Sequence, residues 1–210
     1  MTTFDSNLNS RSITETFAEA QRYFMGQGSV NNALTQLAMD LKSRGIDYAV
    51  IGAVALLAYG YPRFTEDIDL VMTSEGLERF HQELVGLGYA PAFPGARKRL
   101  RSIQEQVSID VMTTGEYPGD RQPKPVRVPD PSTASVEIDG VRFVTLEKLI
   151  ELKLASGMTA ADRLKDLADV QELIKIRELQ PEFAEQLNPY VRGRFLELYE
   201  TIKQSSKDED

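Results

Sequence analysis

Residues 66–72 alternate acidic and apolar side chains in the order EDIDLVM. This two-residue period is typical of a β-strand, in which successive side chains point to opposite faces of the sheet. Asp67 and Asp69 therefore share one face, while Ile68 and Leu70 point into a core. Two like charges side by side repel each other, and a cation between them relieves that repulsion. The same alternation also describes an ordinary half-exposed strand, so the pair alone does not establish a metal site.

A third acid, Asp110, has apolar neighbours in the strand-like segment VSIDVM. If this strand lies beside residues 66–72, three carboxylates converge at a site for one or two divalent cations, as used in phosphoryl and nucleotidyl transfer. The chain has no cysteine and one histidine, His81, which we expect at the surface of an amphipathic helix. Any metal must therefore be held by oxygen, which favours Mg²⁺ or Mn²⁺ over Zn²⁺.

Gly52 follows a short apolar segment, residues 47–51, that is typical of a buried strand, and it opens a short helical stretch. A glycine lets the backbone approach a phosphate, and the first N–H groups of a helix favour anions. Arg63 and Thr65 stand just before the paired acids, where a cation can meet a triphosphate. The alternatives are a plain strand-to-helix turn, a surface arginine and a strand-favouring threonine.

The pattern along the chain changes once and predicts an α+β fold. Strand-like and helix-like stretches mix up to about residue 143, and only helical patterns follow. We expect a small mixed β-sheet core with flanking helices, followed by a C-terminal helical module. The expected parts are a partly helical or frayed extension over 1–29, the core over 30–143, the helical module over 144–204 and a disordered acidic tail over 205–210.

Cap and turn residues set the expected element boundaries. The core helices are expected over 30–44, capped by Ser29, and from a Ser74 cap to about Leu87. Strands are expected within 98–112, and Asp139-Gly140 predicts the turn of a hairpin. Thr145 and Lys148 form half of a capping box. Further helices are expected over 160–178 and 181–204.

The helical module carries charged residues at informative spacing. Lys153 lies on or beside the apolar stripe begun by Leu149 and Ile150, so it must reach water or meet an anion. Asp162, Asp166 and Asp169 follow helical spacing and share a face. Asp166 can pair with Lys153 or Arg163, or help to activate a nucleophile, and the pattern does not decide between these roles.

The net charge of −8, from 24 basic and 32 acidic residues, excludes a general nucleic-acid-coating protein. One dense basic patch, made of Arg97, Lys98, Arg99 and Arg101, fits either a local phosphate contact or an edge strand protected by charge. The sequence has no run of eighteen apolar residues and no secretory signal at its N-terminus. We therefore expect a cytoplasmic protein without a membrane partner.

The run G-A-x-A-L…R-x-T-x-D-I-D-L over 52–70, followed by I-D-V at 109–111, resembles the nucleotidyltransferase fold of the DNA polymerase beta superfamily. Within it, residues 30–178 look most like bacterial nucleotidyltransferase-like proteins related to abortive-infection and toxin–antitoxin toxins. The helical module also resembles these toxins, which carry a lysine on one helix and a basic-acidic stretch on the next. The resemblance implies nucleotidyl transfer from an NTP, with Mg²⁺ or Mn²⁺, to an acceptor hydroxyl of a tRNA, a protein or a small molecule, and an antitoxin as a possible partner.

The resemblance also implies residue roles. Asp67 and Asp69 match the metal ligands, and Asp110 matches the acid that completes the site and activates the nucleophile. The catalytic set then includes Lys153 and Asp166, and the nucleotide-binding set includes Gly52, Ala53, Arg63 and Thr65.

One position departs from the pattern of active members, which carry a hydroxyl residue after the turn glycine where this chain has Ala53. A lost charge-assisted hydrogen bond costs roughly 1.5–3 kcal/mol, or one to two decades in binding or rate. The alternative to an enzyme is therefore a catalytically degenerate protein that keeps the fold and acts as a binding or regulatory module.

Overall fold

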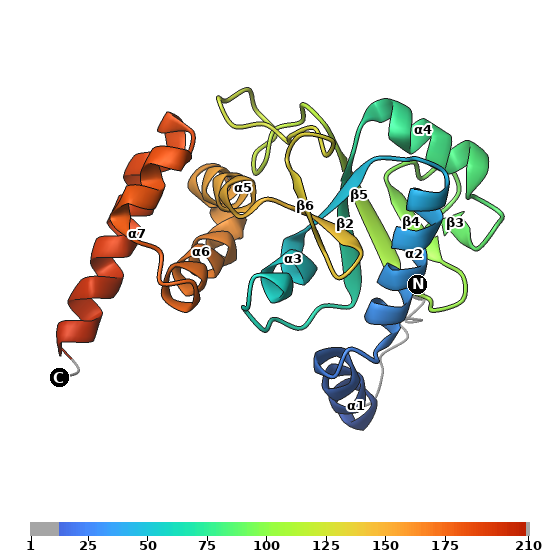
Figure 1. Ribbon diagram of the computed structural model, residues 1–210, viewed down its shortest axis with the longest axis horizontal. Coiled ribbons are helices and arrows are strands. Elements are labelled where there is room, and N and C mark those ends of the chain that lie inside the picture. The colour runs from blue at the N-terminus through green and yellow to red at the C-terminus, as the bar shows by residue number, and fades with distance from the viewer. Residues whose placement is uncertain (1–12, 209–210) are drawn as a thin grey trace, which may run out of the picture.

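The computed structural model describes residues 13–208 of the 210-residue chain. Residues 1–12 of the expected partly helical or frayed extension and the last two residues of the expected tail lie outside this range. Seven strands form one mixed sheet in the order β3-β4-β5-β2-β1-β7-β6 (Figure 1). The strands are β1 (Tyr48–Ile51), β2 (Asp67–Met72), β3 (Tyr89–Pro91), β4 (Arg99–Ser102), β5 (Ser108–Thr113), β6 (Ser135–Ile138) and β7 (Val141–Val144).

Helices flank the sheet, and the described chain after the last strand is helical only. This arrangement confirms the α+β class expected from the sequence. The helices before the last strand are α1 (Ile13–Phe24), α2 (Ser29–Ser43), α3 (Gly52–Ala58) and α4 (Ser74–Glu83). After β7 come α5 (Leu146–Thr159), the 3₁₀ helix η1 (Ala161–Arg163), α6 (Leu164–Ile176), the 3₁₀ helix η2 (Pro181–Gln186) and α7 (Pro189–Asp208). No helix of the described chain is both long and apolar enough to cross a membrane.

One part of the core lies between the sheet and the helices α2 and α4, both of which contact β2, and the buried cluster continues into the C-terminal helices. Ile68 and Leu70 of β2 are fully buried there, together with Leu37 of α2 and Phe80 of α4. Burying each such side chain contributes roughly 1.5–3 kcal/mol. This burial fixes which face of β2 points inward, so the acids of the same strand must point to the other face.

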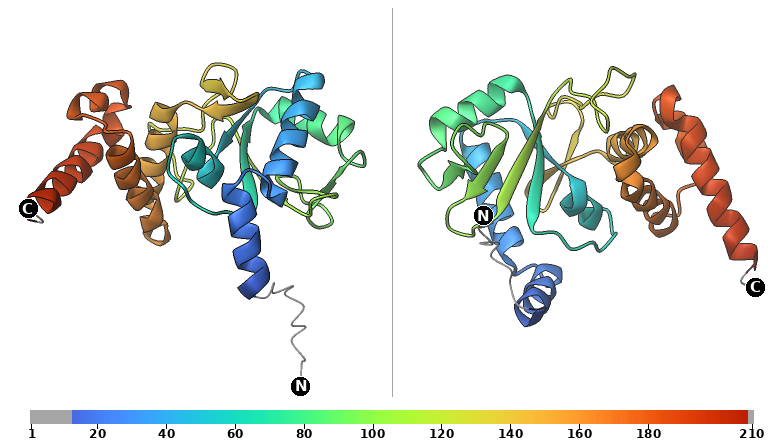
Figure 2. Two further views of the ribbon diagram at one scale, coloured as in Figure 1. Left: turned by 60° about the horizontal axis from the view of Figure 1, so that its bottom comes forward. Right: turned by 180° about the vertical axis from the view of Figure 1, so that it is seen from behind.

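The C-terminal helices stand beside the sheet as a separate layer (Figures 1 and 2). Helix α5 packs against both α6 and α7. The loop after β5 reaches across to α5, where a Cβ at Gly119 would lie 2.9 Å from the backbone oxygen of Ser156. The space between sheet and helical layer is therefore bounded by α5 on one side and by this loop on another.

Two of the three expected caps are wrong. Ser29 is the first residue of α2, and its N–H donates to Glu19 of α1 at 2.7 Å. Thr73, in extended conformation, caps α4 instead of Ser74 by accepting the Gly76 N–H at 2.9 Å. Thr145 occupies the N-cap position of α5 as expected, although its side chain makes no cap hydrogen bond. For α2 a distant residue, Glu19, and for α4 the preceding residue, Thr73, supplies the cap bond that the local pattern assigned to a serine.

Several expected boundaries also differ. Helix α4 ends at Glu83 because the chain turns back to form the Val85–Tyr89 bridge next to β3. The helix expected over 160–178 is split, since Ala160 is extended and a short 3₁₀ turn precedes α6. At the C-terminus α7 continues to Asp208, into the segment expected to be a disordered tail. The hairpin turn at Asp139-Gly140 is confirmed.

Candidate active site

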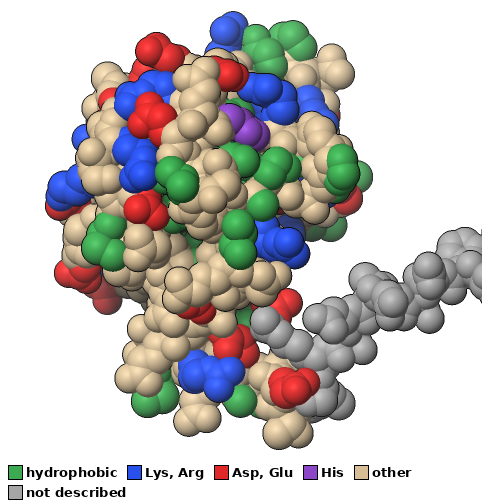
Figure 3. Space-filling model, turned by 90° about the vertical axis from the view of Figure 1, so that its right-hand side faces the viewer, with side chains coloured by type: hydrophobic (Ala, Val, Ile, Leu, Met, Phe, Trp, Pro, Cys, Tyr) green, Lys and Arg blue, Asp and Glu red, His purple; other side chains and the backbone are tan. Residues whose placement is uncertain are grey.

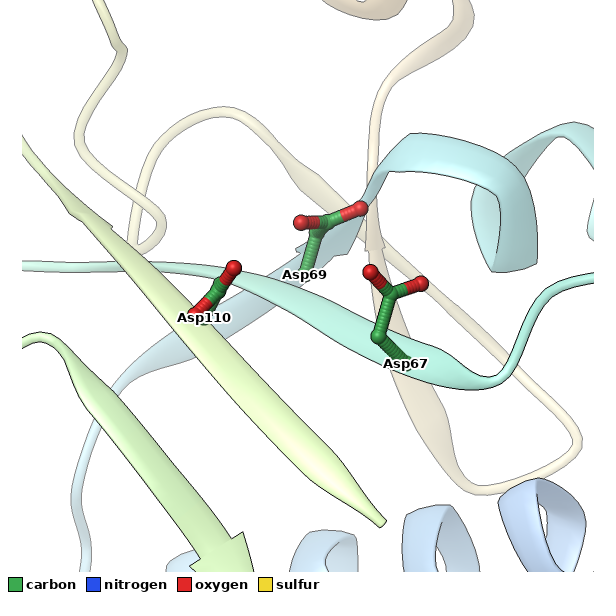
Figure 4. Close-up of side chains that lie close together, drawn as sticks. All are labelled: Asp67, Asp69 and Asp110. Carbon is green, nitrogen blue, oxygen red and sulfur yellow. The ribbon is translucent and has the colours of Figure 1, made fainter. Parts of the chain in front are cut away.

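Two neighbouring strands bring three carboxylates together. Strand β2 pairs in parallel with β5, and Asp69 and Asp110 are register partners. One oxygen of each of Asp67, Asp69 and Asp110 lies within 4.8 Å of the others. Figure 4 shows the three side chains projecting from the same face of the sheet toward the start of α3. The adjacency of the two strands, on which the sequence argument depended, is thus present in the fold.

Gly52 faces the same spot from the end of β1, where Ile51 is paired with Asp69. Its φ of +69° lies in the left-handed region that favours glycine. A Cβ at this position would overlap the Asp69 carboxylate, with Asp69 Cγ only 2.8 Å away. The glycine is therefore required both by the backbone conformation and by the close approach of an acid.

The three acids differ in burial and in their charged and hydrogen-bonding neighbours. Burial, followed by the negative charges of Asp67 and Asp110, raises the pKa of Asp69 to about 6. Asp67 accepts a hydrogen bond from the Thr65 hydroxyl. Asp110 lies 3.6 Å from Arg99, but both side chains are exposed, so this ion pair contributes little. A bound cation would offset the repulsion between the acids, which after burial is the second cause of the raised pKa of Asp69.

This shift predicts a pH-dependent stability difference. Because the folded-state pKa of Asp69 lies above its ordinary 3.8, its protonation stabilises the fold below about pH 4, and this stabilisation is lost as the pH rises through 6. We expect Asp69→Asn to gain stability relative to the wild type between pH 4 and 7.5, by on the order of 2 kcal/mol. Thermal unfolding of both proteins in EDTA across this range measures the difference. A stability difference between the two proteins that does not change with pH would contradict the raised pKa of Asp69.

A cleft of about 290 Å³, called here the inner cleft, lies between the acids and the helical layer. Asp67 and Asp69 line its sheet side, and Met112, Leu149 and Leu152 provide apolar wall. Four basic residues also line it: Arg63, Lys153, Arg163 and Lys165. Positive charge facing two carboxylates suits a polyphosphate that is bound with a cation.

The helical side of the inner cleft is organised by a buried ion cluster. Lys153 donates to Asp166 at 3.0 Å and to Asp169 at 2.6 Å, and all three are less than 9% exposed. Arg63 donates to Asp169 at 2.5 Å, and Ser156 donates to Asp166 at 2.7 Å. Two cations therefore balance two acids. The cluster ties the segment before β2 to α5 and α6, so it also holds the two sides of the cleft together.

A second hollow of about 630 Å³, called here the outer groove, lies on the other side of the acids. Asp67 lines both hollows, whereas Asp110 lines only the outer groove and Asp69 only the inner cleft. Phe64 and the exposed Phe93 form part of its wall. The acids therefore stand at the junction of two hollows, and a reaction between two substrates needs such a junction.

The structure brings together most of the residues singled out from the sequence. The inner cleft is lined by Gly52, Ala53, Arg63, Thr65, Asp67, Asp69, Lys153 and Asp166, and Asp110 joins the acids from β5. Asp162 does not share their face, because it sits on the exposed 3₁₀ turn before α6. The catalytic and nucleotide-binding residues predicted from the sequence did not include Asp169, Arg163, Lys165 or Ser156. Asp169 has a sequence signal, its spacing of three from Asp166, and Arg163 and Lys165 belong to the basic-acidic stretch that resembles the toxins, whereas nothing local marks Ser156.

The basic patch is largely neutralised. Arg97 pairs with Glu78 and Lys98 pairs with Glu116. Strand β4 lies between β3 and β5, so the interpretation as a charged edge strand is wrong. His81 is partly exposed and its ring bonds the Arg97 backbone oxygen at 2.8 Å. Figure 3 shows intermixed positive and negative side chains around this histidine rather than a continuous basic surface.

The donor set fits a hard divalent cation. Asp67, Asp69 and Asp110 offer only carboxylate oxygens, the ligands that Mg²⁺ and Mn²⁺ prefer. The pKa of Asp69 is raised first by burial and then by the negative charges of Asp67 and Asp110, and a cation here would offset that charge. A polar cleft beside the acids leaves room for water and phosphate oxygens to complete the coordination.

The model of a protein family described as nucleotidyl transferase AbiEii toxin, type IV toxin–antitoxin system, matches residues 39–209 of the chain. A comparison with curated proteins gives no match.

Among solved structures, ANT(2'')-Ia in complex with adenylyl-2''-tobramycin is similar, with a TM-score of 0.50 and 16% identity over 81% of this chain and 98% of that one. An antigenic nucleotidyltransferase-like protein from Paracoccidioides brasiliensis has a TM-score of 0.45 and 19% identity over 69% of this chain and 74% of that one. At these identities the similarity to ANT(2'')-Ia shows the fold.

Proposed function

This chain belongs to the AbiEii family of nucleotidyl transferase toxins of type IV toxin–antitoxin systems, and we propose that it moves a nucleoside monophosphate from an NTP to an acceptor hydroxyl. The acceptor oxygen forms a bond to the α-phosphorus, the bond to the β-phosphate oxygen breaks, and pyrophosphate leaves. The observation that carries this proposal is the convergence of three carboxylates at the junction of two hollows.

Asp67, Asp69 and Asp110 would hold Mg²⁺ or Mn²⁺, which when bound neutralises phosphate charge and orients the α-phosphate. Asp69 must be ionised to hold the cation, so with its pKa raised to about 6 the cation competes with a proton for this carboxylate at acidic pH. Asp110 faces the outer groove and can accept the proton of the acceptor hydroxyl.

The inner cleft is proposed to hold the nucleotide. Arg163 and Lys165 are exposed at its rim and can meet the triphosphate directly. Lys153 already neutralises Asp166 and Asp169, so its positive charge serves the phosphates only if it is shared with these acids. Gly52 leaves space for Asp69 and exposes backbone beside Ala53, which lacks the hydroxyl of active relatives.

The acceptor is proposed to enter through the outer groove and to be a tRNA or a protein. Phe93 is 55% exposed on its wall, and an exposed aromatic side chain there offers a packing surface for an acceptor. We expect Phe93→Ala to raise the acceptor KM severalfold while leaving Mg²⁺ and NTP affinity unchanged, because the side chain lines only the outer groove. Steady-state transfer with varied acceptor concentration, together with NTP titration, checks this prediction. An equal loss of affinity for the acceptor and for the NTP would contradict it.

A catalytically degenerate binding protein is the second candidate. Two observations favour it, Ala53 at the turn and the pairing of Lys153 with two acids. Such a protein would bind a partner, an antitoxin for example, with an affinity independent of the acids at the sheet. The proposed place of action is the cytoplasm, with no membrane partner.

One experiment separates the two candidates. The protein is incubated with Mg²⁺ and each of four α-³²P-labelled NTPs, together with total bacterial RNA or a protein extract. The enzyme proposal predicts release of pyrophosphate and label in one acceptor fraction, dependent on Mg²⁺. No label and no pyrophosphate with any NTP would contradict the enzyme and favour the binding protein.

A further inference from the structure

Asp169, on α6, is a buried acid that lies behind the inner cleft. It is 3% exposed and does not line the cleft, whereas Arg63 and Lys153 do. One of its oxygens, Oδ2, accepts hydrogen bonds from both of these cations, from Arg63 at 2.5 Å and from Lys153 at 2.6 Å. Asp169 can therefore act on a nucleotide in the cleft only through the two basic side chains that it holds.

Arg63 stands in a segment without regular backbone structure, since residues 61–65 form neither helix nor strand. The segment runs beside α6 (Figure 1), where a Cβ at Gly60 would lie 3.3 Å from Cγ2 of Ile176. Asp169 lies seven residues before Ile176, about two helical turns, so it is on the same face of α6. Among the described residues, Arg63 has no hydrogen-bond or ion-pair partner other than Asp169. The direction of the Arg63 side chain therefore depends on this acid.

Lys153 is held by two acids at once, since it donates to Asp166 at 3.0 Å and to Asp169 at 2.6 Å. An ammonium group has three donors and a guanidinium group has five, so Lys153 and Arg63 each keep donors that these acids do not use. Both side chains line the inner cleft, which Asp67 and Asp69 line from the sheet. Each cation can therefore bond a phosphate oxygen in the cleft without leaving Asp169.

We propose that Asp169 is a positioning residue for nucleotidyl transfer, which holds Arg63 and Lys153 in the orientation that keeps the triphosphate in line for attack. This inference rests on the proposed function. Groups that hold reactants in a near-attack geometry lower the barrier to the chemical step, so their loss lowers kcat.

A role in charge balance alone predicts a different result. Without the Asp169 carboxylate, the cluster keeps two cations and one acid, Asp166, so its net positive charge rises. The cations would then attract phosphate more strongly. Charge balance therefore predicts tighter NTP binding with an unchanged kcat, whereas positioning predicts a lower kcat without a loss of NTP affinity.

The test compares two acid-to-amide variants of the full chain, Asp169→Asn and Glu151→Gln. Glu151 is the matched control, because it is 4% exposed, accepts hydrogen bonds from Lys148 and from the Asn188 N–H at 2.7 Å each, and lines neither hollow. Both variants should unfold at a lower temperature than the wild type, since each removes the charge of a buried, ion-paired acid.

We expect Asp169→Asn to lower kcat by roughly 10²-fold. Its dissociation constant for a non-hydrolysable NTP analogue with Mg²⁺, measured by isothermal titration, should equal that of the wild type or fall below it. Glu151→Gln should keep the kcat of the wild type. An unchanged kcat in Asp169→Asn, with or without tighter NTP binding, would overturn this inference and leave the proposed function intact.

Arg63→Lys tests the same role from the other side of the ion pair, at a side chain that is 29% exposed and so tolerates substitution. Lysine keeps the charge but lacks the planar fork that bonds Asp169 and a phosphate together. We again expect a lower kcat with NTP affinity kept. If Asp169→Asn is unfolded at the assay temperature, an unchanged kcat in Arg63→Lys overturns the inference.

Two further outcomes would also count against it. Equal loss of kcat in Asp169→Asn and Glu151→Gln would overturn the inference alone, because it would show a general effect of buried charges. Absence of transfer by the unaltered protein would overturn both the inference and the proposed function.

Discussion

The double variant Asp67→Asn/Asp69→Asn is expected to lose nucleotidyl transfer by roughly 10³-fold or more. Both carboxylates project from one face of β2 toward the cleft, and without them the cation and its charge stabilisation of the transferring phosphate are lost. The same variant should be more heat-stable than the wild type in EDTA at pH 7.5. The variant removes the cost of burying the Asp69 charge and also the repulsion between the acids, which are the first and second causes of the raised pKa of Asp69.

The matched control is Asp139→Asn. Asp139 is exposed at the β6–β7 hairpin turn with a φ of +50°, and Asn-Gly suits this turn as well as Asp-Gly does. Its transfer rate and unfolding temperature should equal those of the wild type. A double variant that retains transfer within tenfold of this control would show that the acids do not serve the reaction.

Gly52→Ala should cost both stability and activity. A left-handed φ costs a non-glycine residue roughly 1–2 kcal/mol, and the new methyl group would overlap the Asp69 carboxylate. We expect a total destabilisation of about 2–4 kcal/mol and a loss of transfer of at least about 10²-fold, since a displaced metal ligand misplaces the α-phosphate. Denaturant unfolding and Mg²⁺-dependent pyrophosphate release measure the two effects.

Variants of two other glycines separate the effect of backbone strain from the effect of the close approach to Asp69. Gly140 has a φ of +80° with open space around its Cβ position, so Gly140→Ala should cost only the backbone strain and leave transfer intact. Gly193 lies in α7 with open space and no positive φ, so Gly193→Ala should stabilise the helix by roughly 0.5–1 kcal/mol. If Gly52→Ala behaved like Gly140→Ala, the close approach to Asp69 would have no catalytic consequence.

The sheet acids were predictable because strand period is a local property. The alternation around Ile68 and Leu70 places their acidic neighbours on the opposite face, whatever the rest of the fold does. The glycine after an apolar strand likewise marks a turn by its residue type. The hairpin at Asp139-Gly140 was predictable for the same reason, since this turn demands residues that tolerate positive φ.

Non-local contacts were not predictable in the same way. No local pattern states that β2 pairs with β5, and the convergence of Asp110 with Asp69 depends on that pairing. The pairing of Lys153 with Asp166 was one of several alternatives, and the addition of Arg63 depends on the packing of the helical layer on the sheet. The cap of α2 failed as a prediction because a residue ten positions away supplies it.

The central claim is that three acids gather a divalent cation at the meeting point of two hollows. The most direct measurement is the anomalous scattering of Mn²⁺ in crystals soaked with Mn²⁺ and a non-hydrolysable NTP analogue. The account predicts an anomalous peak within about 2.0–2.5 Å of oxygens from Asp67 and Asp69, with the triphosphate in the inner cleft beside Arg163 and Lys165. A nucleotide bound elsewhere, with no manganese at these carboxylates, would contradict it.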